Sequence, residues 1–168
     1  SPPREDREID AVIAAVEGAT PQQIKDYNNS DKDASYYVKQ HLSKSGLKFN
    51  EDVIEYLEKQ MSPIVRHYKN HFNRPRPYQV ADLYNKKLNR LKTDTAKTPA
   101  YPSGHAMQPM VVALYYSRKY PEHKDELVRM AKISGYGRVI AGLHYPSDYD
   151  AGIELAHKIM EFIDYDKF

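Results

Sequence analysis

Ionisable side chains gather in three short stretches of the chain, and each stretch contains residue types that can hold an oxyanion. The first contains Lys69 and Arg76, seven positions apart, with Arg74 close by and Arg76 between two prolines. An ammonium group acts as a point charge and a guanidinium as a planar two-pronged donor, so the pair suits an oxyanion. The alternatives are cations that favour a helix C-terminus, and an exposed Arg-Pro-Arg-Pro arm that touches nucleic acid.

The second stretch is Pro102-Ser103-Gly104-His105. Ser103 is a good helix N-cap, and Gly104 lets a ligand approach the backbone closely. Because the first amides of a helix have no intrahelical acceptor, they form an anion site. His105 lies in this first turn, where the helix dipole disfavours its charged form unless an anion is bound. An ordinary capped helix with a surface histidine is the alternative.

The third stretch contains Arg138, His144 and Asp148. Residues six apart on one helix point about 120° away from each other, so Arg138 and His144 converge only if the helix ends between them. Gly142 and Pro146 allow this and place His144 in a turn. Asp148 can then accept a hydrogen bond from one ring nitrogen and leave the other with an exposed lone pair, as in a nucleophile or base. A buried, hydrogen-bonded His144 beside a helix-capping Asp148 is the alternative.

Taken together, the three stretches favour one tetrahedral oxyanion, most simply phosphate, as their shared target. One histidine would attack in line while the second protonates the departing oxygen. Three basic groups would spread about three positive charges over the phosphoryl oxygens, so the chemistry needs no metal-ligand cluster. His67 and His71 have helical i, i+4 spacing, but no third ligand is near in sequence, and we expect surface positions for them.

The elements that position these residues are predicted to be helices, because apolar residues recur with helical spacing and no period-2 strand is evident. We expect an all-α, single-domain helical bundle of about six to eight helices, with the motif-bearing core at residues 69–152 of 1–168. In the first half of the chain, helices are predicted near 9–16, from Asn50 for about five turns with a kink at Pro63, and over 80–91. In the second half, they are predicted from Ser103 to before Pro121, over 122–142, and from a capping box at 146–150 to Phe162.

Composition excludes several classes of protein. The chain has 168 residues, no cysteine and a net charge of +2, so disulfides, thiol chemistry and an obligatory polyanion partner are not expected. No apolar run approaches the ~20 residues of a membrane span, and the charged N-terminus has no secretory signal. We therefore expect a soluble protein without nucleic acid as a partner. A cytoplasmic location is favoured, and periplasmic or secreted locations and a homo-oligomer stay open.

The motifs Lys69-x6-Arg76-Pro77, Pro102-Ser103-Gly104-His105 and Arg138-x5-His144-x3-Asp148 occur in this order. They resemble the three signature motifs of the type 2 phosphatidic acid phosphatase and vanadium haloperoxidase superfamily. The resemblance covers about half of the chain and is closest to the small soluble acid phosphatase members.

This resemblance implies a role for each matching residue. His144 would be the nucleophile that forms a phosphohistidine, oriented by Asp148, and His105 would be the acid for the leaving oxygen and later the base for water. The phosphoryl oxygens would be held by Lys69, Arg76, Ser103, Gly104 and Arg138. No metal or other cofactor is implied, and vanadate would bind as a phosphate analogue of the small phosphorylated substrate.

One position departs from the family pattern. The third motif usually begins Ser-Arg, whereas this chain has Gly137-Arg138, so one hydroxyl donor is missing unless Ser134 replaces it. We predict a soluble, metal-independent phosphohydrolase that cleaves small phosphomonoesters, such as nucleotides. The alternatives are a vanadium-dependent haloperoxidase, suggested by the stretch 98–105, and a non-catalytic phosphate-binding protein of the same fold, suggested by Gly137.

Overall fold

The computed structural model describes residues 1–165, which form α-helices and short 3-10 turns and contain no strand. This confirms the all-α prediction and the expected number of helices. The helices are α1 (Ile9–Glu17), α2 (Pro21–Ser30), α3 (Tyr36–Lys44), α4 (Glu51–Phe72), the single turn α5 (Pro77–Val80), α6 (Gly104–Lys119), α7 (Lys124–Ile140) and α8 (Pro146–Met160). Within the described part of the chain, no helix has both the length and the apolar character that a bilayer span requires.

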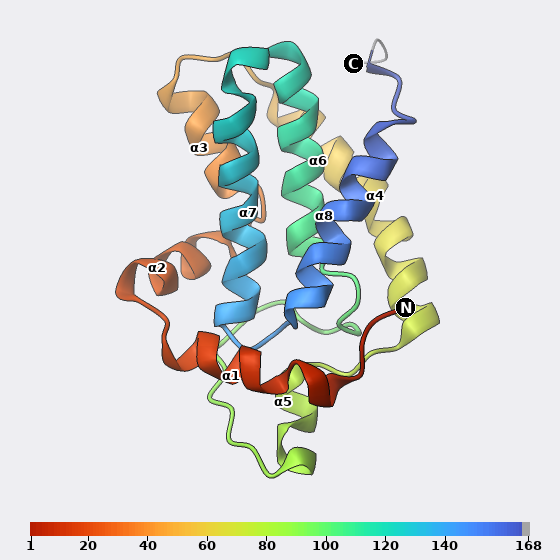
Figure 1. The fold of residues 1–168 in the computed structure, drawn as a ribbon. Coiled ribbons are helices and arrows are strands. Elements are labelled where there is room, and N and C mark those ends of the chain that lie inside the picture. Colours follow the sequence, from red (N-terminus) through yellow and green to blue (C-terminus); the bar gives the residue numbers. More distant parts are fainter. Residues whose placement is uncertain (166–168) are drawn as a thin grey trace.

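Helix α6 is the centre of the bundle and packs chiefly against α7, α8 and α4 (Figure 1). Its side chains are buried on almost every side, including Met107, Met110 and Val111, which have no exposed surface. A helix that is apolar around its whole circumference must be enclosed by others. The surrounding helices therefore hold α6, and the residues at its start, in a fixed position.

Two helix starts were correctly predicted from their capping residues. The Asn50 side chain accepts a hydrogen bond from the Asp52 amide at 2.8 Å at the start of α4. Ser103 accepts one from the Ala106 amide at 3.2 Å at the start of α6. Helix α4 continues through Pro63 as far as Phe72, so one long element connects the apolar core with the predicted oxyanion site.

The helix predicted over 80–91 is wrong. Helix α5 already starts at Pro77, a 3-10 turn follows at Ala81–Tyr84, and Asn85 then takes a left-handed conformation with φ 55°. Left-handed backbone ends a right-handed helix, and residues 86–103 form no further regular element. This long irregular segment passes across the end of the bundle.

The predicted start and end of the last helix also need correction. Tyr145, and not Ser147, is the N-cap position of α8, and Asp148 accepts a hydrogen bond from the Tyr145 amide at 2.8 Å. The capping function predicted for Asp150 thus belongs to Asp148. Phe162 lies beyond the last residue of α8 and is 86% exposed, so it does not join the buried face.

The same end of the bundle contains the C-termini of α4 and α7 and the N-termini of α6 and α8, and α1 crosses it (Figure 1). The three predicted motifs lie at these helix termini and, for Arg76 and Pro77, at the start of α5. Helix termini leave amide or carbonyl groups without intrahelical partners, so this end is suited to binding a polar ligand.

Candidate active site

His144 is buried in the turn between α7 and α8, as the sequence predicted. Its Nδ1 lies 3.1 Å from Oδ2 of Asp148, and its Nε2 lies 3.0 Å from Nη1 of Arg76. Because a guanidinium can only donate, Nε2 must be the acceptor and Nδ1 must carry the proton that goes to Asp148. The two contacts fix the tautomer, and the lone pair of Nε2 points to the cationic side of the site.

Lys69 and Arg76 lie together beneath the irregular segment. Lys69 donates to the Pro99 carbonyl at 2.7 Å and to the Thr98 hydroxyl at 3.1 Å. Arg76 donates to the carbonyl oxygens of Thr98, at 2.9 Å, and Leu143, at 3.2 Å. Both side chains are buried, and the prolines of the Arg-Pro-Arg-Pro stretch hold Arg76 against His144. The exposed-arm alternative is therefore wrong for Arg76.

Arg138 is almost completely buried near the end of α7, where it is paired with an aspartate that the sequence analysis did not identify. Its Nη1 donates to Asp31 at 2.5 Å, and its Nη2 donates to the Thr95 hydroxyl at 2.7 Å. Asp31 also accepts a hydrogen bond from Thr93 at 2.7 Å. Burial alone would raise the pKa of Asp31, but the hydrogen bonds from Thr93 and Arg138 outweigh it and lower that pKa to about 2.

His105 lies in the first turn of α6, partly buried, with Nε2 2.7 Å from the backbone oxygen of Asp31. A carbonyl oxygen can only accept, so Nε2 carries a proton and Nδ1 is the nitrogen that can gain or lose one. Arg76, Lys69 and Arg138 lie close enough to His144 for their positive charges to lower the pKa of that ring, and His105 adds to this effect when it is protonated. The structure therefore brings the two histidines and the three cations together.

Burial and mutual repulsion disfavour positive charge throughout this group. Burial, with a contribution from Arg76, lowers the pKa of Lys69 to about 7, and burial with Arg138 lowers that of His105 to about 3. Burial and Arg76 place the pKa of His144 well below its usual value. His105 is thus neutral without a ligand, whereas the proposed acid role requires a proton that a bound anion would favour.

The remaining predicted residues lie at the ends of α6 and α7. Ser103 is fully buried and its hydroxyl caps α6, and Gly104 is the first residue of that helix, with a backbone amide that has no intrahelical acceptor. Gly137 faces Tyr27, whose Cα would lie 3.6 Å from an added Cβ. The buried Ser134 hydroxyl has no hydrogen-bond partner within residues 1–165.

Sequence reasoning missed the residues that hold the cations from outside the motifs. Thr93, Thr95 and Thr98 all belong to the irregular segment. The one sequence signal that could have indicated them was their spacing within a stretch that lacks helical periodicity. Asp31 follows α2, far from every motif, and no local pattern indicates it. His67 and His71 are exposed, as expected, and no three His, Asp or Glu side chains of residues 1–165 are grouped to hold a metal ion.

A polar cavity of about 860 Å³ opens beside this cluster. Asp31 and Thr93 belong both to its lining and to the shell of hydrogen bonds around Arg138. The other lining side chains are mainly basic or amide groups, from Asn28, Asn29, Lys32, Arg90, Leu91, Lys92 and Asp94. The cavity therefore offers space for a polar group next to the cationic site.

Comparison with known proteins gives matches in the same region. The sequence model of the PAP2 superfamily matches residues 60–157, which contain all three motifs. A non-specific acid phosphatase from Salmonella typhi is 37% identical over 86 residues, which are 50% of this chain and 33% of that protein. An acid phosphatase from Zymomonas mobilis is 32% identical over 90 residues, 52% of this chain and 33% of its own. The matches thus span about a third of these relatives.

Among solved structures, a transmembrane PAP2-type phosphatidylglycerolphosphate phosphatase from Bacillus subtilis has a similar fold. It superposes with a TM-score of 0.59 at 16% sequence identity, and the match covers 95% of this chain and 87% of that one. The likeness extends over almost all helices, well beyond the motif-bearing region.

Proposed function

The chain belongs to the PAP2 superfamily, and we propose that it is a phosphohydrolase that cleaves small phosphomonoesters through a phosphohistidine at His144. The observation that carries the proposal is the orientation of His144. Asp148 and Arg76 hold the ring from opposite sides, so that the unprotonated Nε2 faces the cationic side of the site. A histidine that is oriented by a carboxylate and neutral at physiological pH is suited to nucleophilic attack.

In the proposed first step, the phosphoryl oxygens accept hydrogen bonds from Lys69, Arg76 and Arg138. An oxygen of the substrate takes the place of Nε2 as the acceptor from Arg76, and this frees the lone pair. Nε2 of His144 then attacks phosphorus as the bond to the ester oxygen breaks, and His105 gives the proton on Nδ1 to that oxygen. The cations stabilise the charge on the equatorial oxygens.

In the second step, His105 takes a proton from water through Nδ1, and the water oxygen attacks phosphorus as the bond to Nε2 of His144 breaks. Phosphate leaves, and both histidines return to their starting states. Asp148 accepts the Nδ1 proton of His144 throughout and stabilises the positive charge that the ring acquires. The chain's own side chains supply every group in this scheme.

The leaving group is proposed to extend into the polar cavity that Asp31 and Thr93 border. Lys32, Arg90 and Lys92 favour a polar or anionic leaving group, and Asn28 and Asn29 offer further hydrogen bonds. These properties fit a nucleotide or another polar phosphomonoester better than a long hydrocarbon chain.

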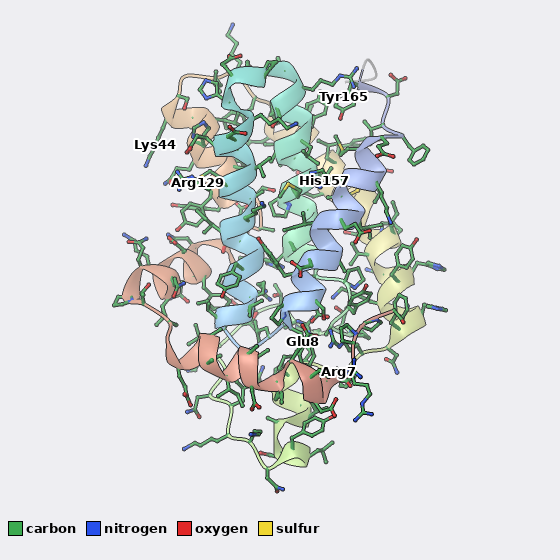
Figure 2. All side chains as sticks on the ribbon, viewed as in Figure 1. Arg7, Glu8, Lys44, Arg129, His157 and Tyr165 are labelled. Carbon is green, nitrogen blue, oxygen red and sulfur yellow. The ribbon has the colours of Figure 1, made fainter. Side chains whose placement is uncertain are left out.

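The proposal is tested with p-nitrophenyl phosphate. We expect His144→Ala to lower kcat by at least ~10³-fold, because the nucleophile is lost. EDTA is expected to leave the activity unchanged. His157→Ala is the matched control, because His157 is exposed in the distal half of α8, the helix that follows His144, and should keep full activity (Figure 2).

An active His144→Ala variant, or an enzyme that EDTA inactivates, would contradict the mechanism. Assay of bromide oxidation with vanadate and peroxide on the same preparation tests the haloperoxidase alternative.

A further inference from the structure

The two carboxylate oxygens of Asp148 have separate partners. Oδ2 accepts from Nδ1 of His144 and from the Tyr145 amide, whereas Oδ1 accepts from Nη1 of Arg74 at 2.7 Å. A carboxylate held by donors on both oxygens cannot rotate without breaking a charge-assisted hydrogen bond. Arg74 therefore contacts the group that orients His144, on the side opposite to His144 itself.

Arg74 is enclosed as completely as Asp148. Their side chains are 1% and 0% exposed. The guanidinium lies 3.9 Å from the centre of the Tyr145 ring, and Nη1 also donates to the Ser147 hydroxyl at 2.7 Å. Buried charge of this kind is costly unless it is paired with close geometry, so the position of Arg74 is tightly determined.

Glu8 holds the opposite edge of the same guanidinium. Its Oε2 accepts from Nη2 of Arg74 at 2.8 Å and its Oε1 from the Ser147 amide at 2.9 Å. The Pro3 carbonyl is a second acceptor for Nη2, at 2.9 Å. Figure 2 shows Glu8 beside the first turn of α8, where the segment before α1 crosses the end of the bundle. The chain's first residues thus reach the catalytic turn through a continuous chain of ion pairs.

We propose that Arg74, anchored by Glu8, is a positioning residue of the active site: it holds Asp148 negatively charged and directed at Nδ1 of His144. The inference rests on the proposed function, since it assigns Arg74 a part in keeping Nε2 of His144 free for attack. Neither Arg74 nor Glu8 touches the phosphoryl site in this scheme, and Arg76 alone of the two arginines reaches His144.

The electrostatics around Asp148 support this role. Burial raises the pKa of Asp148 to about 6, and the positive charge of Arg74 opposes that rise. The other charged or titratable groups that interact with Asp148 include His144 and Tyr145 just before α8, Lys69 on α4, Arg76 before α5 and Tyr101 in the irregular segment. Without Arg74, Asp148 becomes protonated at a higher pH. A neutral carboxylic acid no longer requires a proton on Nδ1 of His144, so the tautomer with a proton on Nε2 becomes populated and attack stops.

Arg74→Gln tests the inference most directly, with Arg74→Lys as the conservative variant. We expect kcat for p-nitrophenyl phosphate to fall by about 10²-fold in Arg74→Gln with KM changed less than threefold, because orientation is lost and binding is kept. The acidic limb of the kcat profile should move up by about one pH unit. Arg74→Lys should restore part of kcat, and its acidic limb should lie close to the pH of the wild-type limb, since lysine retains the positive charge.

A second readout does not depend on activity. Nitrogen-15 NMR of histidine-labelled protein reports which ring nitrogen of His144 carries the proton. At pH 7 we expect the Nδ1-protonated form in the wild type and a mixture in Arg74→Gln. If the wild type hydrolyses no phosphoester, the proposed function fails, while the NMR comparison still decides the link between Arg74 and His144.

Glu8→Gln provides an independent test with a smaller change in shape. It should lower kcat about 10-fold and shift the acidic limb in the same direction as Arg74→Gln, because it loosens the far edge of the guanidinium. The matched controls are Arg129→Gln and Glu126→Gln, which break an exposed ion pair on α7 away from this turn (Figure 2) and should change neither readout.

The inference would be overturned if Arg74→Gln folds and has the same His144 tautomer, kcat and acidic limb as the wild type. If Arg74→Gln does not fold, Glu8→Gln decides, and wild-type values of all three quantities in that variant would overturn it equally.

Discussion

Lys69 is the cation of the site whose charge depends most on pH. Burial and the neighbouring Arg76 lower its pKa to about 7, so the empty site loses this charge above neutral pH. A bound phosphate raises the pKa of Lys69, because an opposite charge favours the protonated form. At a pH between the pKa of Lys69 in the empty site and its pKa in the phosphate-bound site, phosphate binding must therefore take up a proton. The affinity for phosphate must fall as the pH rises above about 7.

Titration calorimetry at pH 8 in buffers with different ionisation enthalpies measures this uptake. We expect the wild type to take up about one proton more per phosphate bound than Lys69→Arg, in which the side chain stays charged. Lys59→Arg, on the exposed face of the same helix, is the control and should behave as the wild type. Equal proton uptake by Lys69→Arg would show that another group titrates.

The side chains of the site could be predicted from sequence to different degrees. Lys69, His105 and His144 could be proposed as site residues because their motifs are local strings with a chemical meaning. The contact of Arg138 with Asp31 joins positions 107 residues apart, and that of Arg74 with Glu8 joins positions 66 apart. Such pairings follow from the packing of whole helices, and no spacing in the sequence expresses them.

The contact between α6 and α8 sets how the second and third motifs face each other. A Cβ added to Gly152 on α8 would lie 2.5 Å from the Ser103 carbonyl oxygen and 2.9 Å from Cβ of Ala106. The first of these atoms is backbone, so it cannot move without displacing the start of α6. Glycine at this position permits the close approach of the two helices.

Gly152→Ala is therefore expected to lower the free energy of unfolding by about 1–3 kcal/mol, the range for overpacking a tight core. Gly137→Ala is the matched control, because its Cβ would make ordinary contacts with Tyr27, and alanine favours a helix interior over glycine. Urea denaturation measures both. A Gly152→Ala variant as stable as Gly137→Ala would contradict the proposed role of this contact.

Several helices with a strong apolar stripe or a clear cap were predicted, but α2 and α3 were missed, although Thr20 and Gln23 form a capping box at the start of α2. Asn50 and Ser103 mark their helix starts by side-chain capping alone. The helix predicted over 80–91 failed because Pro77 starts α5 earlier and the left-handed Asn85 ends the following turn. The irregular segment after it is ordered by hydrogen bonds to the buried cations, a tertiary effect that helical periodicity cannot reveal.

The molecule as a whole places the buried cations Lys69, Arg74, Arg76 and Arg138 at one end of the helical bundle. Like charges at close range destabilise the folded state, so an anion that binds among them should stabilise the whole protein. At a phosphate concentration 100 times Kd, the gain is about 2.7 kcal/mol, or about 5–10 °C in Tm for a domain of this size.

Thermal unfolding with increasing phosphate or vanadate measures this stabilisation. Lys69→Met should show a clearly smaller rise in Tm than the wild type, whereas Lys59→Met, on the exposed face of α4, should show the full rise. An equal rise in all three proteins would place the anion elsewhere on the molecule.

The central claim is that His144 becomes phosphorylated during turnover. Rapid quenching of the reaction with p-nitrophenyl phosphate into alkali, which preserves phosphohistidine, followed by peptide mass spectrometry, tests it most directly. We expect one phosphoryl group on the peptide that contains residue 144, more of it in His105→Ala because water is no longer activated, and none in His144→Ala. Full hydrolytic activity without a phosphoenzyme, or a phosphoryl group on another residue, would contradict the mechanism.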